Sequence, residues 1–209
     1  MGPTTAAAVL FVAAAVGGHL WADAAGRSTA RALLKVAASA GMLVVAAPGG
    51  LHGRFAQLIF AGLVLSAAGD VLLLSAARRS FLAGVVAFLV AHIAYSVAFA
   101  PASRPSPVLA VALVAVAAAV VRWLWPHLGA MRVPVIAYAA VISAMLLLAL
   151  GVQSSLVRWG ALLFYLSDLT VARDRFVAPG LGNRVVGLPL YYCGQVLLGI
   201  AAAAPRYWP

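Results

Sequence analysis

The sequence predicts an all-α protein, a polytopic membrane bundle of about eight transmembrane helices that forms a single transmembrane domain over residues 1–209. Of its 209 residues, 66% are hydrophobic and 9% are charged, whereas soluble domains have about 45–50% apolar and about 25% charged residues. Almost no stretch is polar enough to coat a water-facing surface. The alternation of polar and apolar residues typical of a membrane β-barrel is also absent, which leaves a helical bundle.

Eight windows in order along the chain are long and apolar enough to cross a membrane. A helix needs roughly 17–25 such residues to span the hydrocarbon core. The windows fall at about 4–22, 30–47, 55–76, 80–100, 107–125, 132–151, 156–173 and 185–204. The connections between them are short and carry proline or glycine, as at Pro48 to Gly50, Pro101 to Pro107, Pro126 and Pro179-Gly180, which favours turns.

The basic residues predict an orientation. The net charge is +10, yet the basic residues occur singly or in pairs between apolar runs, so they indicate membrane anchors and no nucleic-acid surface. The odd-numbered connections carry ten of them, Arg27, Arg31, Lys35, Arg78, Arg79, Arg122, Arg132, Arg173, Arg175 and Arg184, against four elsewhere, Arg54, Arg104, Arg158 and Arg206. The positive-inside rule then predicts cytoplasmic odd connections and extracytoplasmic termini in a multi-pass protein of the cell (plasma or inner) membrane.

Two aspartates within apolar runs are the strongest functional candidates. The chain has four acidic residues and no glutamate, and Asp70 and Asp168 lie inside the third and seventh windows. A carboxylate at membrane depth is costly unless it faces a polar cavity or a partner. At about 1.5 Å per residue, Asp70 lies about 9 Å from the predicted cytoplasmic end of its helix, and Asp168 lies a similar distance from the same end of its own helix. Either could simply brace a neighbouring helix, but the pair at one depth favours a shared site.

A weak internal echo supports reading the two as a pair. Gly69-Asp70 and Ser167-Asp168 are each followed by apolar residues, arginines and a phenylalanine, Phe81 or Phe176. The two segments are four helices apart, which would fit a parallel four-plus-four repeat.

Other polar residues in the apolar runs are candidates for substrate contact, and each has a plainer interpretation. Lys35 could pair with a carboxylate or a lipid phosphate, or extend to the interface. His92 and Tyr95 share a helix face, where a buried histidine could equally bond to a backbone carbonyl. Polar groups in the last window could bind substrate or only join helices. The candidates are Lys35, His92, Tyr95, Arg173, Tyr191, Tyr192 and Gln195, and Asp23 falls in the same half of the bundle.

Several familiar site types have no counterpart. There is no HExxH, no glycine-rich phosphate loop and no GxSxG motif. The four histidines are dispersed, and Cys193 is the single cysteine, so we expect no metal and no cofactor. A Ser-His-Asp triad stays open, because a triad is defined in space and not by order.

Four segments together resemble the YhhN-like family of membrane proteins, the lysoplasmalogenases. They are GDVLLL at 69–74, FLAGVVAFLVAHIAYSVAF at 81–99, LFYLSDLTVARDRF at 163–176 and PLYYCGQVLLG at 189–199. Lys35 also lies where the family places a lysine, although Val36 follows it in place of the expected proline. The resemblance covers about residues 27 to 204.

The resemblance implies a hydrolase that cleaves the vinyl-ether bond of lysoplasmalogens to a fatty aldehyde and a glycerophospho-ethanolamine or -choline. Such a reaction needs a proton donor and a base, which two carboxylates can supply as Asp70 and Asp168. The lysophospholipid would enter from the membrane, with no cofactor. A small-solute or proton-coupled transporter is the alternative, since buried aspartate, lysine and histidine also mark ion relays. A structural protein would leave the clustered polar residues unexplained.

Overall fold

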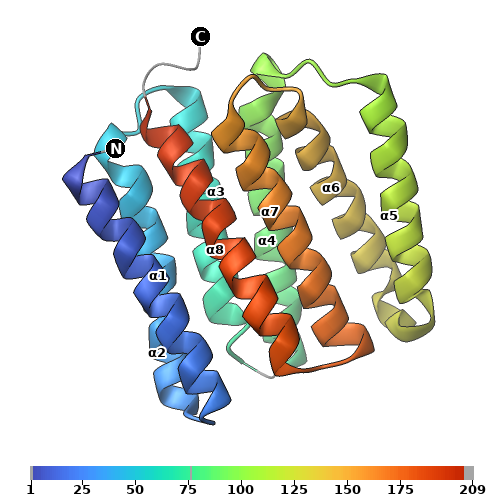
Figure 1. The fold of residues 1–209 in the computed structure, drawn as a ribbon. Coiled ribbons are helices and arrows are strands. Elements are labelled where there is room, and N and C mark those ends of the chain that lie inside the picture. The colour runs from blue at the N-terminus through green and yellow to red at the C-terminus, as the bar shows by residue number, and fades with distance from the viewer. Residues whose placement is uncertain (1, 76, 205–209) are drawn as a thin grey trace.

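The computed structural model describes residues 2–75 and 77–204, which form eight α-helices and no strand. The helices run roughly parallel to one another as one bundle (Figure 1). They are α1 (Pro3–Ala24), α2 (Ser28–Ala46), α3 (Gly53–Leu72), α4 (Arg78–Phe99), α5 (Pro107–Leu128), α6 (Arg132–Leu150), α7 (Ser155–Ala172) and α8 (Leu181–Ala203). Each predicted window therefore corresponds to one helix, and the expected helical bundle is confirmed.

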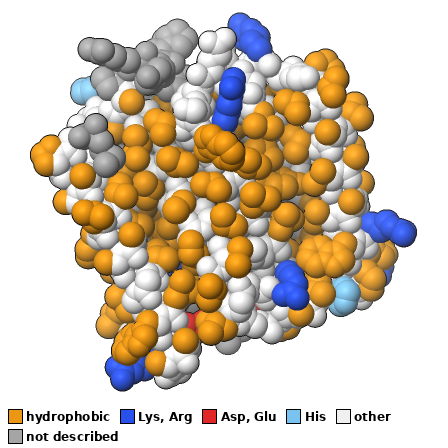
Figure 2. All heavy atoms as spheres, viewed as in Figure 1, with side chains coloured by type: hydrophobic (Ala, Val, Ile, Leu, Met, Phe, Trp, Pro, Cys, Tyr) orange, Lys and Arg blue, Asp and Glu red, His pale blue; other side chains and the backbone are white. Residues whose placement is uncertain are grey.

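The helices have the length and composition of membrane spans. Six continuous helical stretches qualify, and one of them, Pro107–Leu150 with 44 residues, contains both α5 and α6. The remaining helix, α7, is the shortest at 18 residues and carries Arg158 and Asp168. Figure 2 shows that one face of the molecule is covered largely by hydrophobic side chains, as expected of a surface in contact with lipid. The chain is thus a multi-pass membrane protein.

Two details differ from the predicted windows. The structure starts α8 at Leu181, earlier than the expected residue 185, so Pro189 lies further from the start of the helix than predicted. After α7, the chain continues into one turn of π-helix, η4 (Arg173–Val177), which apolar periodicity does not reveal. Such wide turns are uncommon and often lie near functional sites.

Helices that follow one another in the sequence pair into antiparallel hairpins, and α8 packs against helices of more than one hairpin. The hairpins α1–α2, α3–α4 and α7–α8 are the most closely packed pairs. Helix α8 also packs against α1, α2 and α3, and α4 packs against α6. Helix α5 lies at one edge (Figure 1) and contacts chiefly α6, with only Leu124 and Leu128 buried. One side of the bundle is therefore loosely closed.

Glycines allow the close packing that positions the polar residues. A Cβ atom on Gly62 of α3 would overlap the ring of Tyr95 on α4, and one on Gly194 of α8 would lie 2.7 Å from the carbonyl oxygen of Gly160 on α7. Small residues at such contacts let membrane helices approach closely. They allow α3 to pack closely on α4 and α7 on α8.

Candidate active site

A cavity of about 320 Å³ lies between the helices, near the end of the bundle where α3 and α7 end and α4 and α8 begin. All helices contribute to its wall. One part is polar, with charged residues from α2, α3, α7, η4 and α8. The other part is apolar and is formed largely by α4, α5 and α6, for example by Val85, Val120 and Ile142. The cavity therefore has one polar and one apolar side, which match the two ends of an amphiphile.

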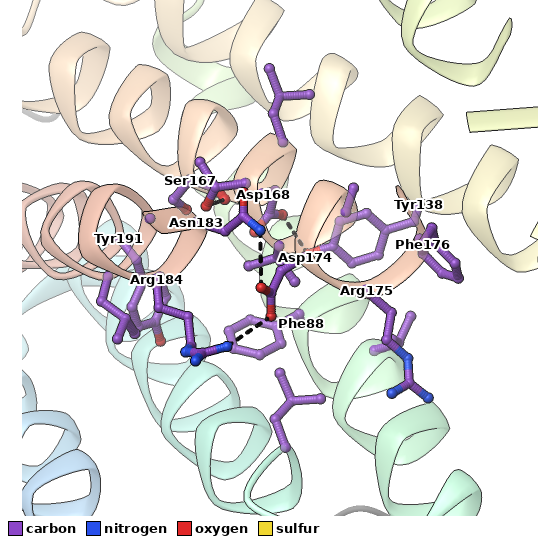
Figure 3. Close-up of a pocket in the computed structure, with 18 of the residues that line it drawn as sticks. Phe88, Tyr138, Ser167, Asp168, Asp174, Arg175, Phe176, Asn183, Arg184 and Tyr191 are labelled. Atoms are coloured by element: carbon purple, nitrogen blue, oxygen red, sulfur yellow. Dashed lines mark hydrogen bonds and ion pairs between the residues drawn. The ribbon is translucent and has the colours of Figure 1, made fainter. Parts of the chain in front are cut away.

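Both aspartates line this cavity. Asp70 comes from the last turn of α3 and Asp168 from the last turn of α7. Figure 3 shows Asp168 and Tyr191 among the residues around the space, with Tyr138 reaching Asp168 across it. The sequence predicted two carboxylates at one depth, and the fold brings them to one space.

Asp70 has an environment built for a charged carboxylate. Its Oδ1 atom lies 3.2 Å from Nζ of Lys35. Its Oδ2 atom accepts hydrogen bonds from the Ser39 hydroxyl and the Tyr191 hydroxyl, both at 2.8 Å, and from the Tyr192 hydroxyl at 3.4 Å. A buried carboxylate is tolerated when it is paired with a cation and hydrogen-bonded. Here α2 and α8 supply both kinds of partner.

Asp168 has far fewer partners. Its Oδ2 atom accepts a hydrogen bond of 2.6 Å from the hydroxyl of Tyr138 on α6. No lysine or arginine contacts it within residues 2–75 and 77–204, and its side chain is 18% exposed against 4% for Asp70. Asp168 is thus the more open of the two carboxyl groups.

His92 lies behind Asp168, fully buried on α4. Its Nδ1 atom is 2.6 Å from the carbonyl oxygen of Phe88. Because a carbonyl can only accept, Nδ1 carries the proton of this hydrogen bond. The other nitrogen, Nε2, has no hydrogen-bond partner among the described residues and lies 3.9 Å from Oδ2 of Asp168. His92 therefore has one nitrogen free on the side of Asp168.

The remaining predicted residues lie at different distances from the cavity. Lys35 and Tyr191 line it beside Asp70. Tyr95 and Gln195 are buried behind its wall, where the Tyr95 hydroxyl donates to Oε1 of Gln195 at 2.8 Å. Tyr192 is also buried behind the wall, and its hydroxyl group contacts Oδ2 of Asp70. Arg173 is not part of the cavity wall, although its guanidinium donates a hydrogen bond to Asn183, which is.

Sequence reasoning missed two groups of residues that the structure places at the site. One is Tyr138, which lies about 9 Å into α6 at about 1.5 Å per residue, the depth predicted for both aspartates, so a comparison of depths would have found it. The other is Arg31 and Arg184, which line the cavity and both bind Asp23. The sequence gives no sign that residues from α1, α2 and α8 meet.

Within the part of the chain that the structure describes, no group of three or more histidine, cysteine and acidic side chains could hold a metal ion. The chemistry available at the site is that of carboxyl, phenol, imidazole, ammonium and guanidinium groups. These groups transfer protons and stabilise charge, so the cavity is equipped for acid and base chemistry on an amphiphile.

The fold and the cavity define a polytopic membrane protein with two carboxyl groups at an internal, two-sided site. The model of the YhhN family matches residues 30–202, and the chain belongs to this family, as its motifs predicted. Its relatives include the human lysoplasmalogenase TMEM86B, 36% identical over 170 residues, which are 81% of this chain and 72% of the human protein.

Two further relatives have the same activity in their names. The bovine lysoplasmalogenase TMEM86A is 35% identical over 164 residues, 72% of this chain and 67% of that protein. The lysoplasmalogenase of Mycobacterium tuberculosis is 34% identical over 179 residues, 78% of this chain and 67% of its own length. No solved structure matches the chain.

Proposed function

We propose that this chain is a membrane-embedded lysoplasmalogenase, a hydrolase that cleaves the vinyl-ether bond of lysoplasmalogens to a fatty aldehyde and a glycerophospho-ethanolamine or -choline. Its membership of the YhhN family and its relatives named lysoplasmalogenase support this activity. The structural observation that carries the proposal is the presence of Asp70 and Asp168 in one cavity with a polar and an apolar side.

The reaction needs one proton donor and one base. A proton is added to the vinyl carbon that does not bear the oxygen, which leaves an oxocarbenium ion. Water adds to the carbon next to the oxygen and gives its proton to the base. The resulting hemiacetal collapses, its hydroxyl proton passing to the departing glycerol oxygen, to yield the aldehyde and the alcohol. The base then returns its proton to the donor, so that the carboxyl pair is restored.

The contacts of Asp168 fit the proton donor. It lacks a lysine or arginine partner in the described residues, its side chain is the more exposed to the cavity, and Oδ1 has no hydrogen bond there. Tyr138 holds Oδ2 in place. The unprotonated Nε2 atom of His92, 3.9 Å from Oδ2, can accept a hydrogen bond from the protonated carboxyl group after a small side-chain movement, because catalytic hydrogen bonds are often long without substrate.

The contacts of Asp70 fit the base that stabilises the oxocarbenium ion and activates water. Its negative charge is fixed by Lys35, and its Oδ2 atom is occupied by hydroxyl donors. A carboxylate has about four acceptor positions, so Oδ1 retains one for a water molecule. The donors are preorganised, which is the usual source of electrostatic stabilisation in enzymes.

The other predicted residues would shape the site around these two groups. Lys35 and Tyr191 lie at the wall and orient Asp70, while Tyr192, Tyr95 and Gln195 support that wall from behind. The alkenyl chain would occupy the apolar side next to α5, whose loose packing offers an entrance from the lipid.

The proposal is tested by aldehyde release from lysoplasmalogen by the purified protein in detergent. We expect release by the wild type, unaffected by chelators. Asp70→Asn and Asp168→Asn should each lower turnover about 10²–10⁴-fold, the usual value of one acid or base group. Binding of a saturated ether analogue, which cannot be hydrolysed in this way, checks that each variant still folds and binds lipid. Normal turnover in both folded variants would contradict the assignment.

A further inference from the structure

Two arginines from different helices meet at the polar end of the cavity. Arg31 lies in the first turn of α2 and Arg184 in the first turn of α8. Nη1 of Arg31 is 3.1 Å from Oδ1 of Asp23, and Nε of Arg184 is 2.6 Å from Oδ2 of the same carboxylate. One aspartate from α1 thus holds two guanidinium groups together.

The carboxylate lies behind the arginines and not between them and the cavity. Arg31 and Arg184 line the cavity, whereas Asp23 does not, and its side chain is only 5% exposed. The two arginine side chains are 38% and 35% exposed. This arrangement fixes the direction of both guanidinium groups while leaving them open on the cavity side, so little ordering would be needed on binding.

Most of the guanidinium hydrogens remain available. Each arginine has five N–H donors. Within residues 2–75 and 77–204, Arg31 uses one of them, and its buried Nε atom has no partner. Arg184 uses Nε and makes a longer contact of 3.5 Å from Nη1 to Asp174 at the rim (Figure 3). Both guanidinium groups line the cavity and are partly exposed, so their remaining donors are available to an acceptor group that comes from outside the chain.

Resting on the proposed function, we propose that Arg31 and Arg184, held by Asp23, form the binding site for the phosphate group of the lysophospholipid. Arginine pairs favour phosphate because a planar guanidinium can donate two parallel hydrogen bonds to its oxygens. The phosphate of the substrate is the acceptor whose charge and number of oxygens match these free donors.

The position of the pair relative to Asp70 fits this substrate. Arg31, Lys35 and Ser39 follow one another at intervals of four residues on α2, so they share a face. Lys35 and Ser39 both bind Asp70. Arg31 is therefore about one helical turn, about 6 Å along the axis at about 1.5 Å per residue, further toward the start of α2 than Lys35. A glycerol backbone would bridge that distance, with its phosphate at the arginines and its vinyl ether at the carboxylates.

The test compares two substrates, a lysoplasmalogen and the matching 1-alkenyl glycerol, which lacks the phosphate together with the amine of the head group. We expect Arg31→Gln and Arg184→Gln to lower kcat/KM for the lysoplasmalogen about 10- to 100-fold, the value of a charge-assisted hydrogen bond. Activity on the alkenyl glycerol should stay within about twofold, which also shows that the variants fold. Arg27→Gln is the matched control, because Arg27 is exposed one turn earlier, stacks on Trp21 and does not line the cavity.

Equal losses on both substrates, or no loss on the lysoplasmalogen, would overturn the proposal. A wild type that releases aldehyde from neither substrate would refute the proposed function instead. In that case, stabilisation of the wild type by glycerophosphoethanolamine, absent in both glutamine variants, would still support the phosphate site. Equal stabilisation by inorganic phosphate at the same concentration would identify a site for free phosphate and overturn the lipid assignment.

Discussion

At the scale of single residues, the two aspartates differ in what surrounds them. Asp70 contacts an ammonium group and three hydroxyl groups, whereas Asp168 contacts one phenol and lies near one imidazole. The same residue type can serve as donor in one environment and as charged carboxylate in another. We therefore propose that the neighbours, and not the aspartates themselves, assign the two roles.

A double-variant cycle tests the pairing of Lys35 with Asp70. Lys35→Met should lower the free energy of unfolding by about 3–5 kcal/mol, because it leaves a buried carboxylate without its cation. Adding Asp70→Asn should recover most of that loss, since no charge is then buried. Thermal unfolding in one detergent measures all four proteins. If the two losses simply add, the ion pair contributes no coupling and Lys35 is free to act on substrate alone.

At the scale of helices, the two carboxyl groups have equivalent settings. The partners of Asp70 on α3 come from α2 and α8. The neighbours of Asp168 on α7 come from α6 and α4. The helices correspond in pairs that are four apart along the chain: α3 with α7, α2 with α6, and α8 with α4. This correspondence supports the four-plus-four repeat that the sequence indicated. The two settings differ in one partner, because α2 supplies Lys35 to Asp70 and α6 supplies Tyr138 to Asp168.

Helix α5 gives a prediction about the apolar side of the cavity. Ala117 lines the cavity, and its neighbour Ala118 is exposed on the outside of the bundle. Ala117→Phe should fill part of the space proposed for the alkenyl chain and shift the preference in kcat/KM toward shorter chains by about tenfold, since each methylene excluded from an apolar site is worth about 0.8 kcal/mol. Ala118→Phe should leave the preference unchanged. Aldehyde release from a series of chain lengths measures both preferences. An equal change of preference in the two variants would contradict this location of the alkenyl chain.

At the scale of the whole molecule, the sequence predicts the helices better than their contacts. Membrane spans follow from apolar length, since each one must satisfy its own backbone hydrogen bonds, and all eight windows matched helices. The depth of Asp70 and Asp168 follows from counting residues along a helix. Which helices meet does not, because several faces of each helix are equally apolar and small. The sequence alone therefore does not predict that Arg31 and Arg184 both bind Asp23, or that Arg173 lies outside the cavity wall.

The orientation in the membrane is the last prediction, and it follows from charge and fold together. Ten of the fourteen basic residues are near the odd-numbered connections, and the cavity lies toward the same end of the bundle, where η4 and the first turns of α2, α4 and α8 line it. The positive-inside rule places this end in the cytoplasm. A reporter fused after Pro209 should therefore be extracytoplasmic, and one inserted between α7 and α8 cytoplasmic. Reversed signals would put the phosphate-binding arginines at the outer leaflet, and the substrate would then have to come from that side.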